Sequence, residues 1–196
     1  MTPILRTLLL GLAVLPACAQ GSGFGIHGSL LAGLDSLRKA THGRGGITLG
    51  LDHQTRLPHA DMGVRTGLTL GWMPGRTKAG LTTDLRLVQA FGDLRIPVGG
   101  SLVTAIAGLS VNHYGLTKTG TESDEPSDVE RHFPVRDARG LKLGVRLGVS
   151  LRLSDRWSGE LLLQQTELAG KDLEDPLVRP GGINPAWIQF GVRCAF

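Results

Sequence analysis

Charged residues at alternate positions carry the clearest potential for chemistry in this sequence. In segment 141–153 every odd position is aliphatic, and Lys142, Arg146 and Arg152 occupy even positions between them. Charges spaced by two residues lie on one face of an extended strand, whereas a helix would bring arginine and leucine onto the same face. We therefore expect the charged face of this segment to be separate from its aliphatic face.

Other segments place charged side chains on a corresponding face. Together they predict a network of basic residues with acidic partners, namely Arg65, Arg86, Lys142, Arg146, Arg152 and Arg193 with Asp52, Asp84 and Glu160. Such residues could line an ion path or form ion pairs. Because charges enclosed in a narrow space must be paired, we expect a salt-bridge and hydrogen-bond network with little conductance.

Two histidines lie near hydroxyl residues and are candidates for a general base. His27 is two residues before Ser29, and His113 is near Ser110 and Ser101. A catalytic nucleophile needs a base within hydrogen-bond reach. Residues two apart are neighbours on any strand, however, and no flanking motif supports either pair. We predict no catalytic residue.

Segment 121–139 is rich in carboxylates, with Glu122, Asp124, Glu125, Asp128 and Glu130. Clustered carboxylates can hold calcium, but the spacing and the glycine of an EF-hand loop are absent. We expect a solvated loop, and the sequence predicts neither a metal site nor a cofactor.

The composition limits the elements that can position these side chains. The chain has 196 residues, of which 29 are glycine, 41% are hydrophobic and 19% are charged. The hydrophobic content excludes a disordered chain, and glycine at this frequency is unfavourable in helices. The net charge of +4 comes from scattered basic residues with few aromatic residues among them, so we predict no nucleic-acid partner.

Alternation of apolar and polar residues predicts eight strands, near 24–34, 47–52, 62–72, 82–98, 103–111, 141–153, 157–167 and 186–196. The fourth is irregular, because Gln89 and Asp93 interrupt the parity of Leu85, Leu87 and Phe91, and this suggests a bulge. The links include tight turns at 97–100 and 154–156 and long segments at 36–44, 73–80, 116–139 and 168–185. This is the pattern of an up-and-down barrel with short turns at one end.

Glycines on the polar face indicate which side of the strands faces inward. They include Gly25, Gly50, Gly67, Gly144 and Gly191. The interior of an eight-stranded barrel is only wide enough for side chains, so large arginines fit there where their neighbours are glycine. The polar face is thus predicted to line the lumen and the aliphatic face to contact lipid.

Aromatic residues are few for such a barrel, which usually has aromatic girdles at both membrane interfaces. We expect a thin girdle from residues near the strand ends: Phe24, Trp72, Tyr114, Trp157 and Trp187.

Residues 1–19 are predicted to be a signal peptide, and 20–196 the barrel. Arg6 precedes an apolar run, and small residues precede a cleavage site before Gln20. The alternative is a lipoprotein signal, in which Cys18 would be acylated.

The last strand carries a recognisable pattern. Phe190, Val192 and the terminal Phe196 occupy alternate positions, which resembles the C-terminal signal of outer-membrane barrels. With eight alternating strands, the chain resembles the small outer-membrane barrels of the OmpA/OmpX type. Cys194 departs from that pattern, since an aromatic residue often stands there.

The resemblance implies an all-β, eight-stranded, antiparallel up-and-down transmembrane barrel in the outer membrane, with its termini in the periplasm and the four long links outside. It also implies two partners, outer-membrane lipid and the barrel-assembly machinery, and an extracellular-loop partner stays unidentified. A structural or adhesive role is expected, and no enzyme activity. The alternatives are a lipid A-modifying barrel enzyme, a narrow pore and, more remotely, a soluble lipocalin-like barrel.

Overall fold

The computed structural model describes residues 23–34, 37–38, 45–58, 60–74, 81–99, 102–122, 131–170 and 186–196. The predicted signal peptide, Cys18 and Ser101 lie outside these residues. Eight strands follow one another along the chain: β1 (Gly23–Gly33), β2 (Gly45–Arg56), β3 (Gly63–Met73), β4 (Leu81–Val98), β5 (Val103–Glu122), β6 (Arg131–Arg152), β7 (Trp157–Gly170) and β8 (Ala186–Ala195).

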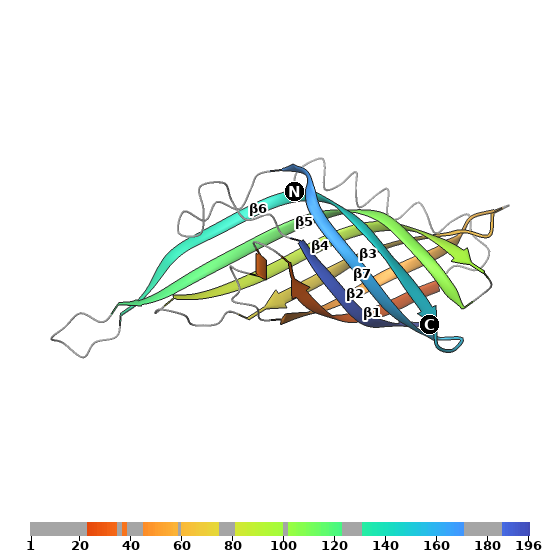
Figure 1. Cartoon of the computed structure of the whole chain (residues 1–196), viewed down its shortest axis with the longest axis horizontal. Coiled ribbons are helices and arrows are strands. Elements are labelled where there is room, and N and C mark those ends of the chain that lie inside the picture. The colour runs from red at the N-terminus through yellow and green to blue at the C-terminus, as the bar shows by residue number, and fades with distance from the viewer. Residues whose placement is uncertain are drawn as a thin grey trace.

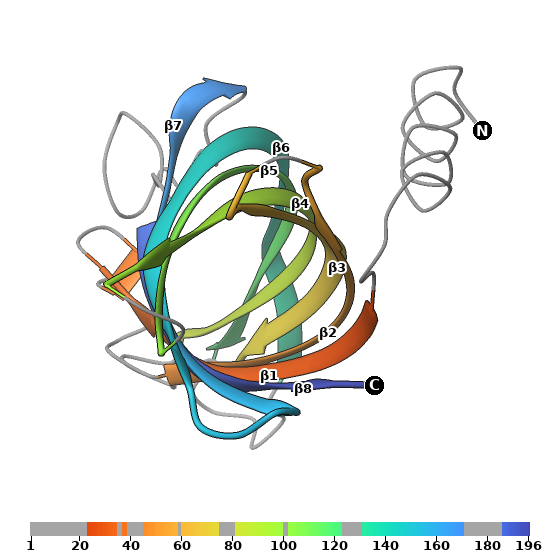
Figure 2. The ribbon, with the colours of Figure 1, turned by 90° about the vertical axis from the view of Figure 1, so that its right-hand side faces the viewer.

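Every strand pairs antiparallel with the next, and β8 returns to β1, so the sheet closes into a barrel (Figures 1 and 2). At the closure Gly25 lies opposite Ala195, and the Phe196 backbone N–H donates to the Phe24 carbonyl at 3.0 Å. The predicted fold, an eight-stranded antiparallel up-and-down β-barrel, is confirmed.

The two ends of the barrel differ in their connections. Gly23 and Phe196 lie at one end, called here the terminal end, with the short β2–β3, β4–β5 and β6–β7 links. The β4–β5 turn uses Gly99 at φ 63°, a left-handed conformation that glycine adopts without strain. The other end, the loop end, has the longer links. Strands β5 and β6 extend further towards it than predicted, to Glu122 and from Arg131.

The strands separate two unlike surfaces. Exposed aliphatic residues cover the outside, among them Leu49, Leu70, Leu109, Leu147 and Leu163, whereas buried polar and charged residues fill the inside. The sequence-based assignment of polar side chains to the lumen agrees with this arrangement in seven of the strands, and β4 is the exception. None of the described residues belongs to a helix long and apolar enough to cross a membrane.

Strand β4 departs from the sequence prediction in two ways. Its register with β3 and with β5 runs without a shift, so the predicted bulge is wrong. The register shifts lie instead on either side of β6, between Lys118 and Thr119 and between Leu143 and Val145. In β4 the residues of one parity, from Leu85 to Arg95, all point inward, and the large apolar ones share the lumen with the polar ones.

Two of the five aromatic residues expected in a girdle face the lumen instead. Tyr114 and Trp187 are fully buried, and their ring centroids are 5.8 Å apart in an edge-on arrangement. Phe24, Trp72 and Trp157 do lie on the outer surface. The girdle prediction is therefore wrong for Tyr114 and Trp187.

Glycine makes room for the large lumenal side chains at specific points. A Cβ atom on Gly25 would lie 2.7 Å from Cζ of Arg193, and a Cβ atom on Gly67 would lie 2.7 Å from Cζ of Phe91. Both distances are shorter than a van der Waals contact. The absence of a side chain at these positions is therefore a condition for the lumenal packing.

Candidate functional site

Among the described residues, buried polar and charged side chains gather in the lumen, around Arg65 of β3. Arg65 is 1% exposed. Its Nη1 donates to both oxygens of Glu160 at 2.7 and 2.9 Å, and its Nη2 donates to Asp93 Oδ2 at 2.9 Å. One guanidinium thus connects β3 with β4 and β7 across the barrel interior.

Two further arginines share the same carboxylates. Arg95 Nη1 donates to Glu160 Oε1 at 2.8 Å, and Arg146 Nε donates to Asp93 Oδ1 at 2.9 Å. Because ion pairs buried in low dielectric are costly to separate, this cluster locks four strands together. It contains three guanidiniums and two carboxylates, so its formal charge is positive, and Arg65 Nε has no hydrogen-bond partner.

Phe91 lies among these cations. Cζ of Arg146 is 4.0 Å from the Phe91 ring centroid, and Cζ of Arg65 is 5.4 Å from it. A guanidinium over an aromatic face is attracted by the ring quadrupole. Phe91 therefore supplies contacts that replace water around the arginines.

A second cluster lies on β1, β2 and β8. Arg193 donates to Asp52 through Nε, at 2.8 and 3.0 Å, and through Nη2 at 2.6 Å. His27 Nδ1 donates to Asp52 Oδ2 at 3.1 Å, and its Nε2 lies 2.9 Å from the Thr69 hydroxyl. The carboxylate of Asp52 is thereby satisfied from two sides.

A layer of amides lies further towards the loop end. Gln89 Nε2 donates to Asn112 Oδ1 at 2.6 Å and to Gln164 Oε1 at 2.7 Å, and Gln164 Nε2 donates to Ser110 Oγ at 2.9 Å. A short hydrogen bond from Arg146 to Gln89 joins this layer to the charged cluster. All of these residues are buried.

At the loop end the lumen is filled by an apolar cluster, the lumen plug, which comprises Leu31, Leu37, Met73, Leu85, Leu87, Tyr114 and Trp187. Each is 3% exposed or less. Along its axis the described interior therefore passes from apolar side chains through amides to ion pairs.

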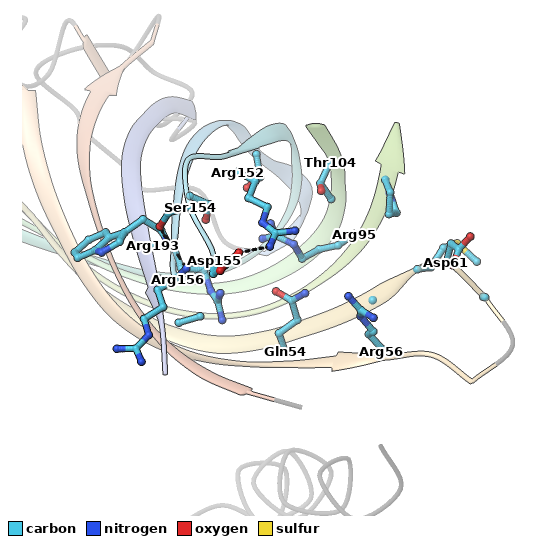
Figure 3. Close-up of a pocket in the computed structure, with 18 residues that line it drawn as sticks. Gln54, Arg56, Asp61, Arg95, Thr104, Arg152, Ser154, Asp155, Arg156 and Arg193 are labelled. Carbon is cyan, nitrogen blue, oxygen red and sulfur yellow. Dashed lines mark hydrogen bonds and ion pairs between the residues drawn. The ribbon is translucent and has the colours of Figure 1, made fainter. Parts of the chain in front are cut away.

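The terminal end is open. A pocket of about 610 Å³, called here the mouth pocket, lies among the ends of β2, β4, β6 and β8 and the short turns (Figure 3). Its charged lining residues are Arg56, Arg95, Arg152, Arg156 and Arg193 with Asp61 and Asp155. Arg95 and Arg193 also belong to the buried clusters, so the pocket opens directly onto the network.

Six of the nine predicted network residues lie buried in the lumen: Asp52, Arg65, Lys142, Arg146, Glu160 and Arg193. Arg152 has the inward parity but lies at the mouth, where its side chain is half exposed and its Nη2 is 2.6 Å from Asp155. It belongs to the mouth pocket, because β6 ends at this residue.

The prediction is wrong for Asp84 and Arg86. They share the parity of the exposed Val88, so they lie on the outer face of β4. Arg86 faces Trp72 across the β3–β4 pairing, at the loop-end border of the aliphatic surface. A charge is tolerated there because long side chains reach towards the polar interface.

Because the inward and outward faces of β4 are exchanged in the prediction, the predicted network also lacks three buried polar residues of this strand, Gln89, Asp93 and Arg95. Because Leu85, Leu87 and Phe91 are large and apolar, sequence reasoning assigns them to the lipid-facing side. A usable signal is present on the opposite parity, since Val88, Ala90, Leu94 and Ile96 form an uncharged series.

The structure does not assemble the candidate hydroxyl–histidine pairs. Ser29 accepts a hydrogen bond from Thr48 rather than from His27, at 3.1 Å. His113 is exposed on the outer face, whereas Ser110 is buried in the lumen. His27 does connect Asp52 with the Thr69 hydroxyl, but Thr69 is 2% exposed and is not among the residues that line the mouth pocket.

No protein-family model matches this chain, and no curated protein matches its sequence. Solved structures do match its fold. Neisserial surface protein A is 13% identical, with a TM-score of 0.54 over 91% of this chain and 99% of that one. Ail, the attachment invasion locus protein of Yersinia pestis, is 10% identical, with a TM-score of 0.57 over 89% and 97%.

A major outer membrane protein from Thermus thermophilus is 15% identical, with a TM-score of 0.53 over 90% of this chain and 100% of that one. At such identities the likeness concerns the fold alone. The chain has the fold of small eight-stranded outer-membrane barrels.

Proposed function

We propose that this protein is an outer-membrane β-barrel with a closed, filled lumen and a structural or adhesive role at the cell surface. The observation that carries the proposal is the reversal of polarity between its surfaces. Aliphatic side chains are exposed on the outside, and ion pairs are buried inside. This arrangement is stable in a bilayer, because the aliphatic side chains contact lipid. Among β-sheets, only a closed one pairs all of its backbone N–H and C=O groups within the hydrocarbon region.

The height of the aliphatic surface suits a membrane. On β6 the outward positions are aliphatic from Leu141 to Leu151, which matches the about nine to eleven residues that a tilted strand needs to cross a bilayer. On β4 the outward series starts at Val88, and Arg86 lies just beyond it. Charge thus begins where the apolar surface ends.

Orientation follows from the connections. Barrels in outer membranes keep short turns on the periplasmic side and longer loops outside. We therefore assign the terminal end, with Gly23 and Phe196, to the periplasm. Export through the predicted signal peptide and insertion by the barrel-assembly machinery belong to the same proposal.

The adhesive part of the proposal is supported by names of proteins with the same fold. One is called a surface protein, and another is called an attachment invasion locus protein. Surface loops on a rigid scaffold are frequent binding sites. The filled lumen favours this role over transport.

Gel migration of the membrane fraction before and after heating tests the barrel, and protease treatment of intact cells tests its orientation. A folded barrel migrates faster unheated than heated, and protease should cut within 117–139. Identical migration with and without heating would refute the barrel in the membrane, and a segment cut only after cell lysis would reverse the orientation.

A lipid A-modifying enzyme is the first alternative, and its test is mass spectrometry of lipid A. Variants His27→Ala and His113→Ala should leave lipid A acylation unchanged. A change in acylation with either variant would favour the enzyme.

A further inference from the structure

The mouth pocket has an excess of positive charge. Among the described residues, five arginines line it, whereas its acidic lining residues are Asp61 and Asp155. Asp155 is paired with Arg152, and both side chains are at least half exposed. Arg56 is exposed at the end of β2 and forms no ion pair with any of the described residues.

The buried clusters behind the pocket do not remove this excess. Arg95 reaches Glu160, but that carboxylate also accepts both hydrogen bonds from Arg65 Nη1. Arg65 and Arg146 in turn share Asp93. Three guanidiniums therefore have two carboxylates between them, and the third charge, that of Arg95, lies on the wall of the pocket.

Guanidinium groups from three strands surround one volume. Figure 3 shows Arg56 of β2, Arg95 of β4 and Arg152 of β6 pointing into the same space, with Gln54 beside them. Guanidinium presents a planar fork of donors that matches oxyanions. A planar carboxylate offers two oxygens in one plane. A phosphate directs its oxygens tetrahedrally and can accept hydrogen bonds from three guanidinium groups at once.

We propose that the mouth pocket binds a phosphate-class anion through Arg56, Arg95 and Arg152. A pocket of about 610 Å³ is within the range of small-molecule sites. Two sources share this chemistry: a soluble phosphorylated compound and the headgroup of an anionic phospholipid from the surrounding leaflet. The proposal requires the folded barrel but not an adhesive role.

Titration calorimetry with inorganic pyrophosphate tests this proposal on the barrel folded in zwitterionic micelles. The double variant Arg56→Gln/Arg152→Gln removes two of the three guanidiniums without touching the buried clusters. We expect its affinity to fall about tenfold or more, or about 1.4 kcal/mol. Arg38→Gln is the matched control, because it removes an exposed arginine at the loop end and should bind as the parent does.

Heat-modifiable migration of each variant checks that the barrel is folded, which separates failure of folding from failure of binding. If the double variant does not fold, the single variant Arg56→Gln replaces it, since Arg56 has no ion pair among the described residues. Absence of pyrophosphate binding, or an equal loss with Arg38→Gln, overturns the proposal.

Nanodiscs distinguish the two sources. Equal pyrophosphate affinity in phosphatidylcholine and phosphatidylglycerol discs would support a soluble ligand. Weaker affinity in phosphatidylglycerol, together with phosphatidylglycerol retained by the parent and lost by the double variant in native mass spectrometry, would support the lipid headgroup.

Discussion

At the scale of single residues, stability depends on how the lumenal charges are shared. Glu160 accepts hydrogen bonds from Arg65 and Arg95, and both arginines are nearly inaccessible to solvent. Removing one charge of a buried pair leaves its partner without compensation, which costs more than the pair contributed. Glu160 thus serves two buried guanidiniums, as Asp93 does for Arg65 and Arg146.

We expect Glu160→Gln to lower the free energy of unfolding by about 3 kcal/mol, because the buried Arg95 would lose its recorded counter-charge and Arg65 would keep only Asp93. Urea unfolding from phospholipid vesicles, followed by heat-modifiable migration, measures it. Asp155→Asn is the control, since its pair with Arg152 is exposed and such pairs contribute little. Equal losses in both variants would contradict a special role for the buried cluster.

A second prediction concerns Gly67. A valine there would place its Cβ 2.7 Å from Phe91 Cζ and 2.5 Å from the Leu51 carbonyl oxygen. Overpacking of this kind costs about 2 kcal/mol, measured by the same unfolding assay. Gly28→Val should be neutral, because the nearest atom to its Cβ outside the adjacent residues would be the Thr48 carbonyl oxygen, at 3.7 Å. A neutral Gly67→Val would show that Phe91 can move aside.

At the scale of elements, the sequence predicts the inward and outward faces of seven strands correctly, but β5 and β6 extend well beyond the predicted 103–111 and 141–153. On β6 the prediction succeeds between Leu141 and Arg152, because there the large aliphatic residues are at odd positions and the charges at even positions. On β4 the prediction fails because both large apolar and charged side chains of this strand point into the lumen. Leu85 and Leu87 complete the lumen plug and Phe91 packs against arginine, so size and apolarity do not mark the lipid side.

The charged network can be predicted only in part from the sequence, because its ion pairs join side chains from different strands. Parity alone identifies Arg65, Asp52 and Glu160. Their pairing depends on the register between distant strands, which no local pattern encodes. The mouth pocket was missed because its arginines lie on separate strands and turns that only closure of the barrel brings together.

The orientation of β4 can be tested directly. In a Cys18→Ser/Cys194→Ser background, a fluorophore attached to cysteine at Val88 should be quenched by brominated lipids, because this side chain faces outward. A fluorophore at Gln89 should be quenched much less. Stronger quenching at 89 than at 88 would reverse the assignment of faces.

The last strand carries a further prediction. Phe190, on the outer face of β8, and Phe196, the residue after this strand, are 65% and 71% exposed, so they contribute little to the lumen. Deletion of Phe196 should reduce the amount of heat-modifiable barrel in cell membranes several-fold, while the purified chain still refolds in detergent. Loss of refolding in detergent would assign Phe196 a structural role instead of an assembly role.

At the scale of the whole molecule, the filled interior determines permeability. Ion pairs and amides occupy the middle of the lumen, and the lumen plug fills it near the loop end. An ion would have to displace paired charges and then cross apolar side chains, which is unfavourable. The described interior therefore favours a closed scaffold over a pore.

Planar bilayer recordings test this conclusion. We expect no steady large channels from the parent protein, because buried ion pairs, amides and the lumen plug occupy the described lumen. Steady large conductance in freshly reconstituted barrels would overturn the filled-lumen interpretation and favour the narrow pore.

The pairing of β1 with β8 also has a consequence for the timing of biogenesis. Gly25 meets Ala195, so the first strand to be synthesised waits for the last residues of the chain before its outer edge is paired. Contacts so distant in sequence form slowly, since the chain must close its longest loop to make them. Until this pairing forms, the barrel is not closed and the aliphatic faces of its strands do not form a continuous outer surface. A chain in this state is vulnerable to aggregation. Shielding by chaperones should therefore matter until β8 has paired with β1.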